Sequence, residues 1–270
     1  MLIVPRRTVA AAYDTDAQAY ITAVEAADGQ ALETGVRDAI NAFVVGCKAD
    51  GIWTAIKASC ILAGARTLSG ALVPLVGTAP TNVNFVSGDY NRETGLVGNG
   101  STKYLNSNRN QASDPQNSSH LAIYVSNAST GGSGTYSIYA GAGSGTGPSA
   151  SYLEIARYNN SSGLTGVPGY NRTSTYAEIA SLNATGFIGC SRNSSLFFTG
   201  RSGGGNTTVN QVSSAPGNVN VAIFAENYNG AISGYTNARI AFYSIGESLT
   251  LSLLDSRVST LLTAIAAAIP

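Results

Sequence analysis

The chain has 270 residues, of which 44% are hydrophobic and only 11% are charged, and its 15 basic and 15 acidic side chains give a net charge of zero. This apolar content is enough to bury a core, which excludes a disordered chain, and the balanced charge argues against nucleic acids and anionic membranes as partners. A sandwich of this length can form one unit, so we expect one large domain with an appendage.

Residues 1–13 have no helical period and contain Pro5, and they predict an extended arm of the kind that reaches a neighbouring subunit. The apolar start before Arg6 and Arg7 is too short for a secretory signal, so we expect no export by that route. The last apolar run, Leu261 to Ile269, is too short to span a bilayer, and no membrane segment is expected.

Residues 14–60 are predicted to form a helical segment. A first helix follows the capping residues Asp14 to Asp16, and a second carries an apolar stripe from Leu32 to Cys47 at spacings of three and four. A third, shorter helical piece is expected over Ile52 to Ala58. There Trp53 would anchor the piece to the core or, alternatively, would serve as a platform for a ligand.

From residue 61 to residue 247 the helical period disappears. Short apolar or alternating runs take its place, separated by Gly, Asn, Ser and Pro, as in HLAIYVS (120–126) and ARIAFYSIG (238–246). About a dozen such strands fit two packed sheets better than one flat sheet. We therefore predict a mainly β fold, a two-sheet antiparallel jelly-roll sandwich.

Residues 248–270 are predicted to form a closing helix that packs back on the domain, because Leu254, Val258 and Leu261 share one face. Ser248 or Thr250 is expected to cap this helix through its hydroxyl. The two ends of the chain would then form a small helical layer attached to one sandwich.

Three cysteines, Cys47, Cys60 and Cys190, have no CxxC spacing, and an odd number argues against a closed disulfide framework. We expect buried free thiols. A disulfide between Cys47 and Cys60 stays an alternative in an oxidising medium.

No catalytic set is expected. Gly246, Glu247 and Ser248 do not form the Gly-x-Ser-x-Gly turn of a hydrolase, and no strand carries the Glu-x-Asp-x-Glu run that would aim several carboxylates at one sugar. The acids of the β region are scattered singly, at Asp89, Glu93, Asp114, Glu154, Glu178 and Glu226. A glycoside-active enzyme built from distant acids stays an alternative, and replacing Glu154, Glu178 and Glu226 would test it.

No metal or cofactor is expected either. The single histidine, His120, begins a strand and is interpreted as an exposed or strand-end imidazole, not as part of a triad or a zinc site. Four loop oxygens suit calcium better, yet such residues are more often turn formers: Asp89, Asn91, Asp114 and Asn117.

Two Gly-rich stretches, 140–151 and 200–208, lack the Gly-Lys-Ser/Thr of a phosphate loop and are predicted to be loop tips of the sandwich. Eight tyrosines lie near loops or strand ends: Tyr136, Tyr139, Tyr152, Tyr158, Tyr170, Tyr176, Tyr228 and Tyr235. Tyrosines there can stack on sugars or fill a protein interface, and both uses stay open.

The strand series also resembles a known superfamily. GLVGNGSTKYLNSNRN (95–110), GFIGCSRNSSLFFTGRSGG (186–204) and ARIAFYSIGESL before a helix (238–249) are similar to the laminin G-like or concanavalin-like jelly roll of tailed-bacteriophage structural proteins. The resemblance covers about residues 80 to 269. It implies a particle protein, either a head decoration protein or a tail or fibre module, with glycan recognition as a further use.

These observations predict a non-enzymatic structural protein of a bacteriophage virion, made in the host cytoplasm. It would assemble with copies of itself and with other virion proteins through its arm, its helices and its sandwich surfaces. The alternative, which stays open, is a carbohydrate-binding receptor-recognition module of a phage tail with host-surface glycans as partners.

Overall fold

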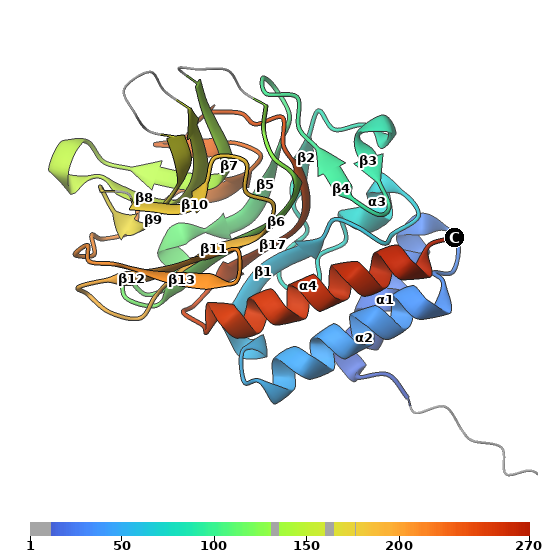
Figure 1. Cartoon of the computed structure of the whole chain (residues 1–270). Helices are drawn as coiled ribbons and strands as arrows, with labels where there is room; N and C mark the ends of the chain where they lie inside the picture. The colour runs from blue at the N-terminus through green and yellow to red at the C-terminus, as the bar shows by residue number, and fades with distance from the viewer. Residues whose placement is uncertain (1–11, 131–134, 160–164, 176) are drawn as a thin grey trace, which may run out of the picture.

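Two mainly antiparallel sheets face one another across a shared core, and a layer of helices covers the outer face of one of them (Figure 1). The computed structural model describes residues 12–130, 135–159, 165–175 and 177–270. The predicted mainly β, two-sheet jelly-roll sandwich with a small helical layer is confirmed. The arm predicted for residues 1–13 lies outside the described residues except at its last two positions.

The helical layer consists of α1 (Thr15–Asp28), α2 (Thr34–Ala49) and α4 (Leu251–Ala268), with the short α3 (Leu68–Ala71) beside α1. α1 begins where predicted, because the Asp14 carboxylate accepts a hydrogen bond from the Asp16 amide. It ends at Gly29, whose φ of 69° is the left-handed conformation that glycine adopts without strain.

The third helical piece predicted over Ile52 to Ala58 is wrong. Only a 3₁₀ turn, η1 (Trp53–Ala55), forms there, and β1 (Ile56–Ile61) follows it and pairs antiparallel with β17 (Arg239–Gly246). A helix of seven residues forms too few hydrogen bonds to offset the free energy of helix nucleation. Pairing with a strand instead provides hydrogen-bond partners for the backbone N–H and C=O groups of this segment. The N-terminal helical segment therefore ends before residue 60.

In the part of the chain that the structure describes, one sheet has eight strands in the order β13-β12-β11-β6-β17-β4-β3, with β1 also paired to β17. Its other strands are β3 (Tyr90–Asn91), β4 (Gly95–Val97), β6 (Ser119–Asn127), β11 (Gly186–Arg192), β12 (Phe198–Ser202) and β13 (Gly205–Val209).

The second sheet has nine described strands, with the path β10-β9-β8-β7-β14-β5-β2. These strands are β2 (Thr81–Val83), β5 (Tyr104–Asn110), β7 (Thr135–Ser144), β8 (Ser151–Asn159), β9 (Thr165–Thr173), β10 (Ala177–Ser181) and β14 (Asn220–Ile223). Two short strands complete it, β15 (Glu226–Tyr228), which pairs in parallel with β7, and β16 (Ala231–Ser233). Three 3₁₀ turns lie in the connections: η2 (Ser87–Asp89), η3 (Gln111–Ser113) and η4 (Gly147–Ser149).

Alternation along the strands divides their side chains between the core and the outer faces. In β6, Leu121 and Ile123 pack in the core between the sheets, whereas Ala122 packs with the helices. In β8, Leu153 and Ile155 fill the same core from the other sheet. The sandwich is thus held by one apolar layer to which both sheets contribute.

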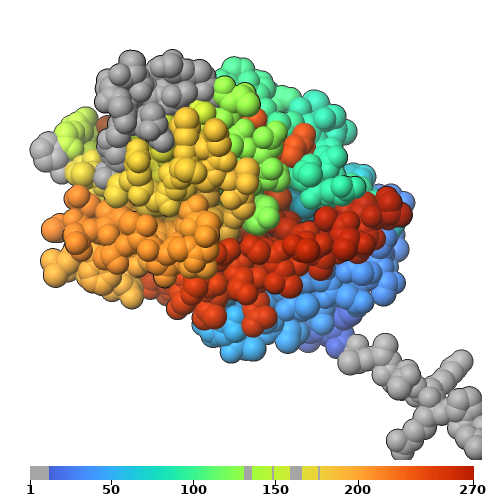
Figure 2. Space-filling view, in the orientation of Figure 1, coloured from blue at the N-terminus to red at the C-terminus, as the bar shows by residue number. Residues whose placement is uncertain are grey.

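The helices close the outer face of the eight-stranded sheet. Phe43 of α2 packs edge-on against Phe242 of β17, with ring centroids 5.9 Å apart. Arg257 of α4 forms an ion pair with Asp50 at 2.7 Å, which ties the closing helix to the C-terminal end of α2. Figure 2 shows α4, in red, lying along α2, in blue, as the predicted helical layer requires.

α4 is longer than the apolar run between residues 261 and 269. By length and composition it is the one described helix that could cross a membrane. In this structure its apolar stripe instead packs on α2 and β11, and the stripe comprises Leu251, Leu254, Val258, Leu261, Leu262 and Ile265.

The predicted hydroxyl cap of α4 is wrong. Thr250 is the N-cap residue, but its carbonyl rather than its side chain engages the first turn, where it accepts from the amide of Leu253. The Ser248 hydroxyl is instead hydrogen-bonded to that of Ser118 at 3.1 Å. Tertiary partners therefore take the oxygen that local capping would use.

Candidate functional site

The outer face of the nine-stranded sheet carries polar and aromatic side chains, and no described helix covers it (Figure 1). Because alternate residues of a strand share a face, Tyr152, Glu154 and Tyr158 of β8 point away from the core that Leu153 and Ile155 fill. Tyr170 reaches the same face from β9.

Two glycines of β7 make room on this face. β8 places Glu154 opposite Gly141 and Tyr152 opposite Gly143, and β15 places Glu226 opposite Gly141. A Cβ on Gly141 would lie 3.0 Å from Cγ of Glu154, and one on Gly143 would lie 2.5 Å from Oε1 of Glu226. Side chains from β8 and β15 therefore meet over β7 because these two positions have none.

The predicted loop tip at 140–151 is wrong for its first half, because residues 140–144 belong to β7. A glycine inside a strand often marks a close approach of other groups, and here the groups are the acids and a tyrosine ring. The second predicted loop tip, 200–208, is also wrong for most of its length. It spans the end of β12 and most of β13, and only Gly203 and Gly204 form the turn between them.

We call the resulting hollow the tyrosine cleft. It has a volume of about 420 Å³, within the range of small-ligand sites. Its lining consists of Tyr136, Ile138, Tyr152, Glu154, Tyr158, Tyr170, Ser174, Glu226, Ser233 and Gly234.

The aromatic rings of the cleft hold one another in place. Tyr152 stacks on Tyr228 with an interplanar angle of 10° and centroids 5.8 Å apart, and Tyr136 packs edge-on against Tyr158 at 4.6 Å. The hydroxyls of Tyr158 and Tyr170 are 3.2 Å apart. Tyr136 is 58% exposed, so one ring stands at the mouth of the cleft.

Glu154 and Glu226 form a buried acid pair, only 2% and 8% exposed. Burial raises the pKa of the Glu154 carboxyl well above its ordinary value, and the Glu226 carboxylate and the hydrogen bond between the two groups raise it further. Burial also raises the pKa of Glu226, while the hydrogen bond from Glu154 lowers it. Both carboxyls therefore hold a proton more tightly than an exposed glutamate does, Glu154 most of all.

One acceptor of this pair is unused. Oε1 of Glu226 is buried and has no hydrogen-bond partner within the described residues. A buried polar atom without a partner costs about 1 to 3 kcal/mol, so the folded protein retains this arrangement at the expense of stability. Such groups gather where a ligand completes the hydrogen bonding.

The expectation that the acids are scattered singly is wrong for Glu154 and Glu226, which are 72 positions apart in the chain and adjacent in space. Glu178 and Glu93 are exposed and do not line the cleft. Glycosidases separate their two carboxyls by about 5 to 9.5 Å, whereas Glu154 and Glu226 lie close enough to be hydrogen-bonded.

The four candidate calcium ligands each have a partner within the described part of the protein. Asp89 pairs with Lys103 at 2.6 Å, and Asp114 pairs with Arg109. Asn91 accepts the amides of residues 93 and 94 in a turn, and Asn117 accepts the Ser213 hydroxyl at 2.6 Å. Within the described residues, no group of three or more His, Cys, Asp and Glu side chains could hold a metal ion.

His120 is the second residue of β6, so its predicted place at a strand end is confirmed, but the ring is fully buried and not exposed. Its Nδ1 donates to the carbonyl of Glu247 at 2.6 Å, and its Nε2 accepts from the Ser244 hydroxyl at 2.8 Å. Burial lowers the pKa of His120 to about 4. The ring is therefore a neutral structural link between β6 and the turn before α4.

The three cysteines are buried free thiols, as predicted, and no disulfide joins Cys47 to Cys60. Burial raises the pKa of each thiol to about 12, which makes the reactive thiolate rare.

The remaining predicted aromatic residues have separate fates. Tyr139 fills the core between the sheets, and Tyr235 packs edge-on against Tyr104 outside the cleft, at 6.3 Å. Tyr176 lies outside the described residues. Trp53 is partly buried against the helical core, as an anchor would be, with Lys48 Nζ 5.8 Å from its ring centroid.

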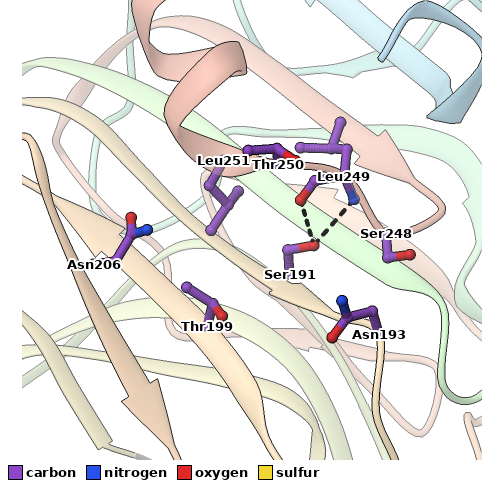
Figure 3. Close-up of a pocket in the computed structure, with 8 residues that line it drawn as sticks. All are labelled: Ser191, Asn193, Thr199, Asn206, Ser248, Leu249, Thr250 and Leu251. Carbon is purple, nitrogen blue, oxygen red and sulfur yellow. Dashed lines mark hydrogen bonds between the residues drawn. The ribbon is translucent and has the colours of Figure 1, made fainter. Parts of the chain in front are cut away.

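A second hollow, of about 340 Å³, lies at the N-terminal end of α4 (Figure 3). Ser191 closes one side of it, since its hydroxyl donates to the carbonyl of Leu249 at 2.9 Å and accepts from the Leu249 amide at 3.1 Å. Its lining has hydroxyls, amides and leucines but no ionisable side chain. The tyrosine cleft, which combines aromatic rings with an acid pair, is the stronger candidate.

No protein-family model matches the chain, and no curated protein matches it. Solved structures that resemble it include the CBM40 of Ruminococcus gnavus IT-sialidase bound to α2,3-sialyllactose, with 12% identity, 54% of this chain and 89% of that chain covered, and a TM-score of 0.41. A Trypanosoma rangeli sialidase mutant has 11% identity, 84% and 39% coverage and a TM-score of 0.47. Tailspike protein 2 of an Escherichia coli O157:H7 bacteriophage has 12% identity, 65% and 25% coverage and a TM-score of 0.38. This chain thus spans most of the first structure and less than half of the other two.

Proposed function

We propose that this protein is a carbohydrate-binding β-sandwich module whose ligand occupies the tyrosine cleft. The observation that carries the proposal is the cleft itself, in which tyrosines surround a buried acid pair on the face that the helices leave open. A sugar ring has an apolar face that packs on aromatic rings and hydroxyls that hydrogen-bond to acids, and a binding site of this kind supplies both.

Each part of the cleft has a distinct role in this proposal. Tyr136, exposed at the mouth, and Tyr152, held by its stacking on Tyr228, offer ring surface to the sugar. Glu226 offers its unused oxygen Oε1 to a hydroxyl of the ligand. Because the acid pair is too close for a glycosidase arrangement, we propose binding without hydrolysis.

A glycan array followed by titration calorimetry tests this function. Tyr152→Ala is expected to weaken a sugar ligand by about tenfold or more, which corresponds to about 1.4 kcal/mol. Tyr104→Ala is the matched control, because Tyr104 belongs to an edge-on tyrosine pair outside the cleft. Absence of saturable binding to any glycan would reject the proposal, and so would equal losses in the two variants.

We further propose that the module belongs to the tail of a bacteriophage, where it would recognise a host-surface glycan. The resemblance of residues 80 to 269 to phage structural proteins supports this placement. The layout also suits it, because the helical layer lies over one sheet and the cleft opens on the other, so attachment to virion proteins or to other copies would leave the cleft free. Mass spectrometry of purified virions tests the placement, and a protein absent from particles would refute it.

A further inference from the structure

The acid pair in the tyrosine cleft has no basic side chain among its described neighbours in the lining. None of the residues that line the cleft is Lys or Arg. Once either carboxyl ionises, the pair carries negative charge in a buried place. Buried charges in proteins are usually paired, because an unpaired one is costly. The missing partner is therefore a feature of the site.

The geometry of the cleft suits a cation in that position. Oε1 of Glu226 is buried without a partner within the described chain, and rings of Tyr152, Tyr158 and Tyr170 line the same space. The negative face of an aromatic ring attracts an ammonium group, by about 0.5 to 2 kcal/mol per contact, and several rings around a carboxylate form a cage for one.

We propose that the ligand of the tyrosine cleft carries a positively charged nitrogen, a protonated amine or a quaternary ammonium, that pairs with Glu226 among the tyrosine rings. Together with the proposed function, on which this inference rests for its saccharide part, the ligand is a glycan that bears such a group. Two sources share this chemistry: a sugar with a free amine, and a glycan decorated with choline.

The design of the cleft argues against the two other charge classes. An anionic sugar would meet the acid pair with no cation to offset the repulsion. A neutral sugar would leave the buried charge unpaired, and a hydroxyl on Oε1 would satisfy the hydrogen bond without balancing the charge. A protonated amine both donates a hydrogen bond to Oε1 and balances the charge, whereas a quaternary ammonium balances the charge among the tyrosine rings.

The test compares three probes on the full chain by titration calorimetry: a glucosamine oligosaccharide, the N-acetylglucosamine oligosaccharide of equal length, and choline. All are measured at a pH at which the amine is protonated. We expect the free-amine oligosaccharide to bind about tenfold or more tightly than its acetylated counterpart, with the gap closing at high salt.

The decisive variant is the double change Glu154→Gln with Glu226→Gln, which keeps the shape and the hydrogen bond but removes the charge. It should lose the preference for the amine. The matched control is Glu93→Gln with Glu247→Gln, two glutamates that do not line the cleft, and it should keep the preference. Thermal melting verifies that both variants are folded.

The possible outcomes separate this inference from the proposed function. An amine preference that the cleft variant abolishes supports the inference. Equal binding of the amine and the acetylated sugar overturns it and leaves carbohydrate binding standing. Choline binding that the cleft variant abolishes, without binding of either sugar, supports the ammonium site and rejects these sugars as its source. If none of the three probes binds, the ammonium inference is overturned, and the glycan array decides the proposed function separately.

Discussion

Each outer face of the sandwich carries an edge-on aromatic pair. On the eight-stranded sheet Phe242 packs against Phe43 of α2, under the helices, and Phe242 is 0% exposed. On the nine-stranded sheet Tyr158 packs against Tyr136, which is 58% exposed, and no described helix lies above them. The same sandwich thus has one outer face that is sealed and one that is open.

The two faces differ in what they contribute to the free energy of folding. Apolar area under the helices contributes stability at about 25 cal/mol per Å². The open face buries the acid pair and leaves a glutamate oxygen without a hydrogen-bond partner among the described residues, both of which cost free energy. Costly groups of this kind in a hollow of ligand size are what the proposed binding function would use.

The largest effect is expected under the helices. Phe242→Ala should lower the free energy of unfolding by about 4 kcal/mol, because it leaves a cavity beside Phe43. Tyr136→Ala, in the aromatic pair of the open face, should cost less than about 1 kcal/mol. Urea unfolding of both variants measures the contrast. Similar losses would mean that the two faces contribute alike to stability.

The covered face also predicts an acid sensitivity. His120 has a pKa of about 4 when folded and an ordinary value of 6.5, so between these values the unfolded chain binds the extra proton and stability falls as the pH drops. The loss should reach about 3 kcal/mol between pH 6.5 and pH 4. Unfolding at several pH values, compared with His120→Gln, isolates this contribution from that of the carboxylates. A variant with the same pH profile as the wild type would contradict it.

The helices could be predicted because their signals are local. Asp14 caps α1, Gly29 ends it, and the apolar stripes of α2 and α4 repeat at helical spacing within one short segment. β1 could not be predicted, because its signal is not local. Its partner, β17, lies about 180 positions later in the chain, and no pattern in the segment from Ile56 indicates that pairing.

The cleft could not be predicted for the same reason. A search for paired acids within one strand compares residues at i and i+2. Glu154 and Glu226 instead belong to different strands, β8 and β15, and lie together because both strands pair with β7. A weak signal exists in mirrored order: Tyr152-x-Glu154 in one strand and Glu226-x-Tyr228 in the other, with Gly141-x-Gly143 between them in space. This sequence pattern can be interpreted only when the registers of the strands are known.

The glycines of β7 allow a smaller test of the open face. Gly143→Ala should destabilise the protein by about 2 kcal/mol and weaken ligand binding, since its Cβ would lie 2.5 Å from Oε1 of Glu226 and 2.6 Å from the Tyr152 ring. Gly88→Ala is the control, because a Cβ there meets nothing within 4 Å. Denaturation and calorimetry report the two effects. An unchanged Gly143 variant would show that the cleft does not need this space.

The smallest effect has the opposite sign and comes from the acid pair itself. Because burial and Glu226 raise the pKa of Glu154, the folded protein keeps a proton that the unfolded chain releases above its ordinary pKa of 4.5. The stability that this proton contributes is complete below pH 4.5 and declines as the pH rises toward the folded pKa. Glu154→Gln keeps a donor toward Glu226 without needing a proton. The free energy of unfolding of the variant should therefore match that of the wild type near pH 4.5 and exceed it by about 1 kcal/mol at pH 8, as measured by urea unfolding.

A variant that is less stable than the wild type at pH 8 would show that the ionisable pair stabilises the fold. The open face would then contribute to stability as the sealed face does, and the contrast between them would fail.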